Sequence, residues 1–72
     1  MLKLDLTGLN CPIPVLRTKK FLANLDKDVL IEVITTDPAS LYDMQDFCNK
    51  TGHVLVSQKS INNQIISIIK HK

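Results

Sequence analysis

Hydrophobic and polar residues alternate strictly over residues 2–6, a pattern typical of a half-buried β-strand. Residues 29–35 form an almost continuous apolar run rich in β-branched side chains, which predicts a more deeply buried, central strand. Two further apolar segments, residues 53–58 and 64–70, are separated by a turn within residues 60–63. The pattern therefore predicts four strands.

Between these strands the apolar residues recur at helical spacing. Residues 12–25 have one apolar face and predict a first helix. A second helix is expected to begin with Asp37 as its N-cap and Pro38 as its first helical residue. It should end near Lys50, because Gly52 is the kind of residue that stops a helix in the left-handed conformation.

The predicted element order is β-α-β-α-β-β, with strands one and two parallel because a helix connects them. The last two strands are joined by a short turn and should be antiparallel. We therefore expect an α/β fold of the α+β two-layer sandwich type: a four-stranded mixed sheet with two helices on one face. Residues 1–72 should form a single domain.

Composition and charge argue against several functional classes. The net charge is only +2, and Phe21, Tyr42 and Phe47 are the only aromatic residues, so strong direct nucleic-acid binding is not expected. His53 and His71 stand at no recognised metal-ligand spacing, and no metal site is expected. The chain shows no signal peptide and no apolar run that could span a membrane, which predicts a cytoplasmic protein with reduced cysteines.

The main candidate for chemistry is Cys11, which stands directly before two prolines at the start of the first predicted helix. Cys11 is expected at the N-cap, Pro12 at the first helical position and Pro14 at the third, where missing N–H groups cost no hydrogen bond. Gly8 supplies the turn before this rigid segment. The positive end of a helix can lower the pKa of a thiol, so Cys11 is expected to be an exposed nucleophile.

Three basic residues of the same helix, Arg17, Lys19 and Lys20, add positive potential near Cys11. Cys48 lies on the apolar stripe of the second helix and should point inward, so it is not a resolving partner for Cys11. A single nucleophile without a base, a deep cleft or a resolving cysteine suits a protein that accepts a group and passes it on. The alternative is that Cys11 closes a turn and the basic residues form a solvated helix face.

The motifs match a known family over nearly the whole chain, in order and in spacing. They are Leu4-Asp5, Gly8, the C-P-x-P box from Cys11 to Pro14, Asp37-Pro38-Ala39, Asp43, Phe47-Cys48 and Gly52-His53. On these residues the chain resembles the TusA/SirA-like small sulfur-carrier proteins, a family with the βαβαββ two-layer sandwich.

The resemblance implies that Cys11 carries sulfur as a covalent persulfide and that the chain itself holds no cofactor. A cysteine desulfurase, which depends on pyridoxal phosphate, would be the donor, and an acceptor protein would take the sulfur onward. The resemblance favours synthesis of 2-thiouridine in tRNA; molybdenum-cofactor and selenium pathways are alternatives. The family's basic residue on the first helix, often arginine, corresponds to Lys19, and its acidic residue before the proline corresponds to Asp37.

Such a carrier is a stoichiometric reactant, although proteins of this kind are often classed as sulfurtransferases, so the residues alone do not decide whether it counts as an enzyme. A non-catalytic interaction or regulatory module that uses the same surface, with Cys11 merely structural, is the alternative from a different functional class. For Asp37 two roles are open: it helps sulfur transfer, or it only caps the second helix.

Overall fold

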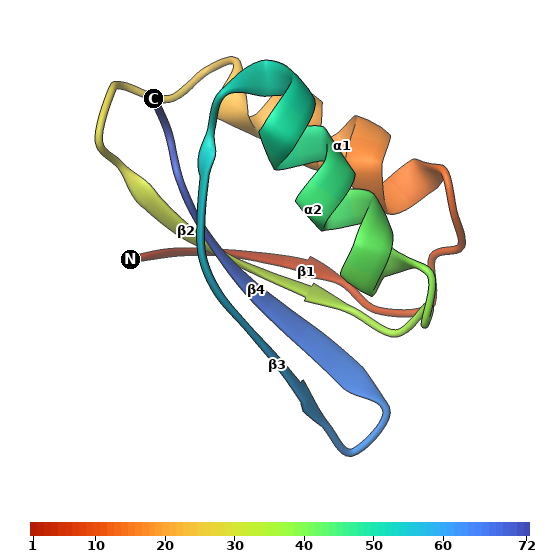
Figure 1. The fold of residues 1–72 in the computed structure, drawn as a ribbon. Coiled ribbons are helices and arrows are strands. Elements are labelled where there is room, and N and C mark those ends of the chain that lie inside the picture. The colour runs from red at the N-terminus through yellow and green to blue at the C-terminus, as the bar shows by residue number, and fades with distance from the viewer.

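The structure consists of one sheet and two helices, and both helices pack on the same face of the sheet (Figure 1). It is a computed structural model that describes all 72 residues. The elements are β1 (Leu2–Leu6), α1 (Ile13–Leu22), β2 (Leu30–Thr35), α2 (Ser40–Thr51), β3 (Val54–Ile61) and β4 (Gln64–Lys70). The predicted order β-α-β-α-β-β and the α+β class with a mixed four-stranded sheet are confirmed.

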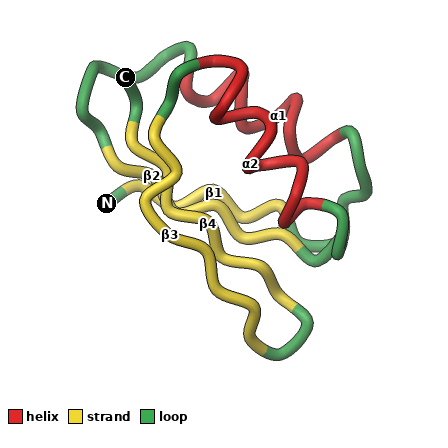
Figure 2. Tube along the Cα trace, in the orientation of Figure 1, coloured by secondary structure: helices red, strands yellow, loops and turns green.

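The strands are arranged in the order β1-β2-β4-β3 (Figure 2). β1 runs parallel to β2, with Leu6 opposite Thr35, whereas β4 is antiparallel to both of its neighbours. Because β1 and β2 are parallel and in this register, their carboxyl ends lie at the same edge of the sheet. The loops that follow them, residues 7–12 and 36–39, therefore meet at that edge.

The hydrophobic core lies between the sheet and the two helices. Ile31 and Val33 of β2, Met44 of α2 and Ile69 of β4 are fully buried. The remaining members of the main cluster are Leu6, Leu22, Phe47 and Cys48. This layer fixes how α1 packs against α2, and so fixes the groove described below.

α1 begins one residue later than the sequence predicts. Pro12 occupies the N-cap position, and the helix starts at Ile13 with Pro14 as its second residue. The prediction that Cys11 is the N-cap is therefore wrong, because Cys11 lies one residue before it, joined to Pro12 by a cis peptide bond. The Ile13 N–H donates to the carbonyl of Asn10 at 2.9 Å, so it is not free to bind an anion.

α1 also ends earlier, at Leu22 instead of near Leu25. The chain continues as tight turns, in which the Leu25 N–H donates to the Leu22 carbonyl at 3.1 Å. Leu25 nevertheless packs against the core cluster from this turn. Leu25 therefore continues the helical spacing of apolar residues in the sequence, although it lies three residues beyond the end of α1. This is why the predicted helix is too long.

α2 begins at Ser40, after Pro38 and Ala39 have formed a turn, so Asp37 is not its N-cap and Pro38 is not its first residue. The Asp37 carboxylate instead accepts the Ala39 N–H at 3.0 Å. This bond stabilises the turn at Pro38 and Ala39 that comes before the helix. The helix ends at Gly52 with a φ of +84°, which confirms the predicted stop.

β3 and β4 form a hairpin whose turn, Asn62 and Asn63, has positive φ at both residues, of 50° and 64°. Asparagine tolerates this conformation, and two such residues match the twist of the adjoining strands. β3 accordingly extends to Ile61, beyond its predicted end at residue 58, with a bulge between Leu55 and Ser57. Neither helix has the length and apolar character needed to cross a membrane.

Candidate functional site

The loop that carries Cys11 is tied to the loop after β2 by two hydrogen bonds between residues far apart in sequence. The Gly8 N–H donates to the Thr36 hydroxyl at 2.8 Å, and the Cys11 N–H donates to the Asp37 carboxylate at 2.7 Å. Gly8 has a φ of +81°, a conformation that glycine adopts without strain. The turn at Gly8 and the carboxylate of Asp37 together fix the backbone that presents the exposed Cys11 thiol.

Asp37 thus connects two segments, because one oxygen of its carboxylate accepts the Cys11 N–H and the other accepts the Ala39 N–H. The hydrogen bond from Cys11, followed by that from Ala39, holds the pKa of Asp37 below its usual value. The carboxylate is therefore ionised at neutral pH. Its position orients the backbone of Cys11.

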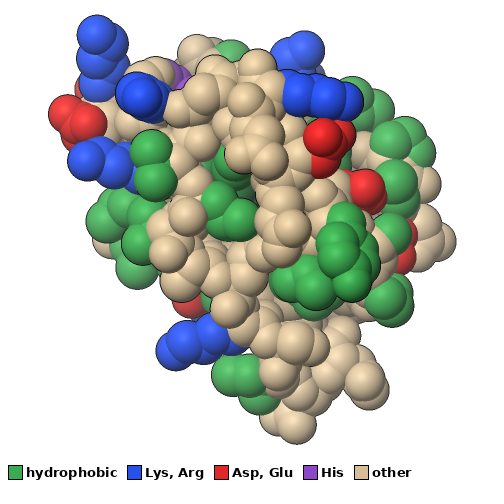
Figure 3. Space-filling model, in the orientation of Figure 1, with side chains coloured by type: hydrophobic (Ala, Val, Ile, Leu, Met, Phe, Trp, Pro, Cys, Tyr) green, Lys and Arg blue, Asp and Glu red, His purple; other side chains and the backbone are tan.

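A groove between α1 and α2 begins at the thiol and has a volume of about 410 Å³. We call it the Cys11 groove; its lining residues are Cys11, Pro12, Val15, Leu16, Lys19, Asp43, Asp46, Phe47, Lys50 and Thr51. Figure 3 shows that acidic, basic and apolar side chains adjoin on the side of the molecule that carries the helices. Leu16 lines the groove and is 58% exposed, and Ile13, three residues earlier in α1, is 42% exposed. Apolar surface of this kind next to a thiol suits contact with another protein.

Asp43 of α2 lies across the groove from Cys11 and changes the expected electrostatics of the thiol. The Asp43 carboxylate, as an acceptor beside the thiol, is the main cause that raises the pKa of Cys11, and burial and the negative charges of Asp43 and Asp37 act in the same direction. The expectation that the helix N-terminus lowers this pKa is therefore wrong. Asp43 and Asp37 both raise this pKa, and Cys11 lies one residue before the N-cap, farther from the helix end than the sequence indicates.

The three basic residues of α1 do not act as one cluster. Lys19 lines the Cys11 groove, whereas Arg17 and Lys20 line a separate hollow beside β1. Within the groove, the acidic residue Asp46 is paired with Lys50 at 2.9 Å. Lys19 is therefore the one basic residue of the predicted set that lies near the thiol.

Cys48, the second cysteine, is buried in the core and only 4% exposed, which confirms the prediction that it points inward. Burial raises its pKa to about 11. His53 accepts a hydrogen bond from the Lys72 N–H at 3.1 Å, which ties the end of the chain to the start of β3. Of the two thiols, only Cys11 is accessible to a partner.

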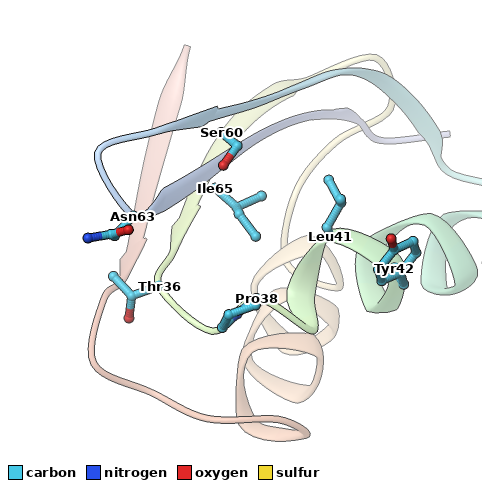
Figure 4. Close-up of a pocket in the computed structure, with 7 residues that line it drawn as sticks. All are labelled: Thr36, Pro38, Leu41, Tyr42, Ser60, Asn63 and Ile65. Atoms are coloured by element: carbon cyan, nitrogen blue, oxygen red, sulfur yellow. The ribbon is translucent and has the colours of Figure 1, made fainter.

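A second and larger hollow, of about 490 Å³, lies between the start of α2 and the β3–β4 hairpin. Figure 4 shows its lining residues, which are Thr36, Pro38, Leu41, Tyr42, Ser60, Asn63 and Ile65. Its only titratable side chain is the Tyr42 phenol, and neither cysteine lines it. The smaller Cys11 groove therefore has the chemistry, although it has less volume.

Sequence reasoning missed the acidic side of the groove. Asp43, Asp46, Phe47 and Lys50 all line it and recur at helical spacing on one stripe of α2. That stripe was visible in the sequence, but its approach to Cys11 depends on how α1 and α2 pack. In the sequence alone, Asp43 is one of the positions that match the family, and nothing local assigns it a role.

The comparisons with known proteins agree with this architecture. Residues 2–71 match the family described as sulfurtransferase TusA. The sulfur carrier protein TusA of Allochromatium vinosum is 40% identical over 68 residues, which cover 94% of this chain and 90% of the relative. The sulfur carrier protein TusA of Pseudomonas putida strain F1 is 41% identical over 69 residues, covering 96% of this chain and 86% of the relative.

A solved structure gives the same result at the level of the fold. The crystal structure of a SirA-like protein from Desulfitobacterium hafniense superimposes with a TM-score of 0.80 at 28% identity, covering 97% of this chain and 95% of the other. The match over residues 2–71 and the relatives at 40% and 41% identity lead to one conclusion: the chain belongs to the TusA family of sulfur-carrier proteins.

Proposed function

We propose that this protein accepts a sulfur atom on Cys11 as a persulfide and delivers it to an acceptor protein. The observation that carries the proposal is the contrast between the two thiols. Cys11 is exposed at the end of a groove, whereas Cys48 is buried with a pKa of about 11. A carrier needs one accessible sulfur and no second thiol that would resolve its persulfide into a disulfide.

The donor that suits this chemistry is a cysteine desulfurase that carries pyridoxal phosphate and presents an enzyme-bound persulfide. Cys11 would attack the outer sulfur of that persulfide, forming a new S–S bond while the donor's own S–S bond breaks. The donor cysteine leaves as a thiolate and takes up the proton that Cys11 releases. The sulfur keeps its oxidation level, so the transfer needs no oxidant and no cofactor on this chain.

The experiment is incubation with a cysteine desulfurase and free cysteine, followed by intact mass measurement without reductant. The protein should gain one sulfur, and Cys11→Ser should gain none. Cys48→Ala is the matched control and should load as the unmutated protein does. Loading of Cys11→Ser, or a complete lack of loading of the unmutated protein, contradicts the proposal.

For the acceptor pathway, we propose a relay that ends in 2-thiouridine in tRNA, within the cytoplasm, on the strength of the family's described role in sulfur transfer. A deletion strain that loses 2-thiouridine and regains it only with an intact Cys11 supports this pathway. A strain that keeps normal 2-thiouridine contradicts it and directs attention to molybdenum-cofactor or selenium metabolism.

A second candidate, an interaction module with a structural Cys11, has one observation in its favour. The Asp43 carboxylate raises the pKa of Cys11, which reduces the share of reactive thiolate in the free protein. The mass measurement separates the two candidates, because such a module gains no sulfur from the desulfurase.

A further inference from the structure

Asp43 lies where its carboxylate can control the proton of the Cys11 thiol. We propose that Asp43 is a positioning residue that holds this thiol hydrogen, so that the free protein keeps Cys11 protonated until a basic side chain of a partner binds the carboxylate. Protonation of the free thiol is argued from the groove and the charges that line it. Its release by a partner rests on the proposed carrier function.

The geometry supports the proposal from both sides of Cys11. On one side, Asp37 accepts the Cys11 N–H at 2.7 Å, so the backbone of the loop is fixed. On the other side, Asp43 lines the same groove as the thiol and lies close enough to it to raise the pKa of Cys11. With the backbone fixed, the thiol stays within reach of the Asp43 carboxylate.

The charges around the thiol leave Asp43 without a cation of its own. The titratable groups that share the groove with Cys11 or bind its N–H are Lys19 from α1, Asp43, Asp46 and Lys50 from α2, and Asp37 from the loop before α2. Of these, only Asp46 and Lys50 form an ion pair. The other ion pairs of the chain are Lys3–Glu32 and Lys70–Asp28. Asp43 and Asp37 are thus unpaired carboxylates, and their complement on a partner is a cation.

A cation bound to Asp43 would act on the thiol in two ways. It would occupy the acceptor that holds the thiol hydrogen, and it would place a positive charge near the sulfur, which favours the thiolate. Since the thiolate is the nucleophile, sulfur transfer would become fast only when a suitable partner is docked. A free carrier would meanwhile react slowly with small disulfides and alkylating agents.

The first test is the pH dependence of Cys11 alkylation by iodoacetamide, followed by peptide mass spectrometry. The thiolate forms a sulfur–carbon bond, iodide leaves, and the thiol proton goes to solvent. Asp43→Asn should move the pH–rate profile to lower pH and raise the rate at pH 7 at least about threefold. Asp26→Asn, which removes an exposed carboxylate outside the groove, is the matched control and should change the profile little.

The result that overturns the proposal is an Asp43→Asn profile that coincides with that of the unmutated protein, or one that moves to higher pH. Thermal unfolding of both variants shows whether they are folded. If Asp43→Asn is unfolded, Asp43→Ser takes its place, since it also removes the charge and leaves the same expectation. A purely structural role of Asp43 would not shift the pH profile of one thiol.

The second test uses two small disulfides as probes of the partner's charge, cystamine and dithiodipropionate, at low salt. Each reacts by thiolate attack on one sulfur, which forms a mixed disulfide and releases the other half as a thiol. The unmutated protein should react faster with cationic cystamine, and this preference should fall at least about threefold in Asp43→Asn. An equal preference in both proteins overturns the role of a partner cation.

Neither probe requires a desulfurase, so the outcomes separate this inference from the proposed function. If the protein never gains sulfur but Asp43→Asn shifts the alkylation profile, the carrier function fails and the control of the thiol proton stands. If the protein loads normally and the profile does not shift, the inference fails and the carrier function stands.

Discussion

Gly8 and Gly52 provide a matched pair for testing how the Cys11 loop is built. Both have positive φ, +81° and +84°, and in both cases an added Cβ meets no atom within 4 Å. Replacement by alanine therefore costs conformational energy and no steric clash. One glycine lies in the loop before Cys11, and the other ends α2.

The magnitude follows from the two conformational terms. An L-residue in the left-handed region costs about 1–2 kcal/mol, while alanine restricts the unfolded chain and regains about 0.4–1 kcal/mol. Each variant should therefore lose about 1 kcal/mol of unfolding free energy. For a domain of this size that lowers Tm by about 4–8 °C. Thermal unfolding followed by circular dichroism measures it directly.

The two variants should differ at the thiol although they agree in stability. Gly8→Ala strains the loop whose Gly8 N–H binds Thr36, so the rate of Cys11 alkylation should change. Gly52→Ala should leave that rate unaltered, because Gly52 does not line the Cys11 groove. If the two stability losses differ by more than about 1 kcal/mol, or either exceeds about 3 kcal/mol, the strain argument is refuted.

Three further predictions concern charge and pH. Lys19→Glu should slow desulfurase loading, most strongly at low salt, whereas Lys20→Glu on the other side of α1 should not; equal slowing by both would remove the specific role of Lys19. Because the folded-state pKa of Asp37 is lowered from 3.8, its stabilisation is complete above that pH and disappears as the pH falls through the lowered value. Asp37→Asn should therefore show a smaller loss of Tm between neutral and acidic pH, and an unchanged acid profile argues against the two N–H bonds as its cause. The pKa of Cys48 is raised from 9.0 to about 11, so its contribution is present below pH 9.0 and is lost between these values. Cys48→Ala should flatten the alkaline decline of Tm, and an equally steep decline in that variant contradicts the assignment.

The sequence pattern predicted the limits of a strand well where its buried and exposed side chains follow a regular pattern along its whole length. The limits of β1 and β4 are confirmed, because strict alternation or a dense apolar run marks both ends of these strands. The helix limits were less accurate. Leu25 packs on the core from a turn, and Asp37 binds two N–H groups in a loop instead of capping α2, so neither residue has the local role that its spacing indicates.

The electrostatics of the site could not be obtained from local sequence. The C-P-x-P box indicates a helix start, and a helix start alone predicts a lowered pKa for the thiol. The opposite direction arises from Asp43 and Asp37, which lie on α2 and in the loop before it. Only the parallel pairing of β1 with β2 and the packing of α1 on α2 bring these carboxylates to Cys11.

The bond from the Cys11 N–H to Asp37 joins residues 26 positions apart in the chain. During synthesis the C-P-x-P segment is made before the residue that orients it, and the bond can form only after both have folded together. A truncated or unfolded chain has the same motif but cannot hold the sulfur in place. Presentation of the thiol therefore begins only when β1 and β2 have paired, and donor proteins that read this placement would pass sulfur only to finished, folded carriers.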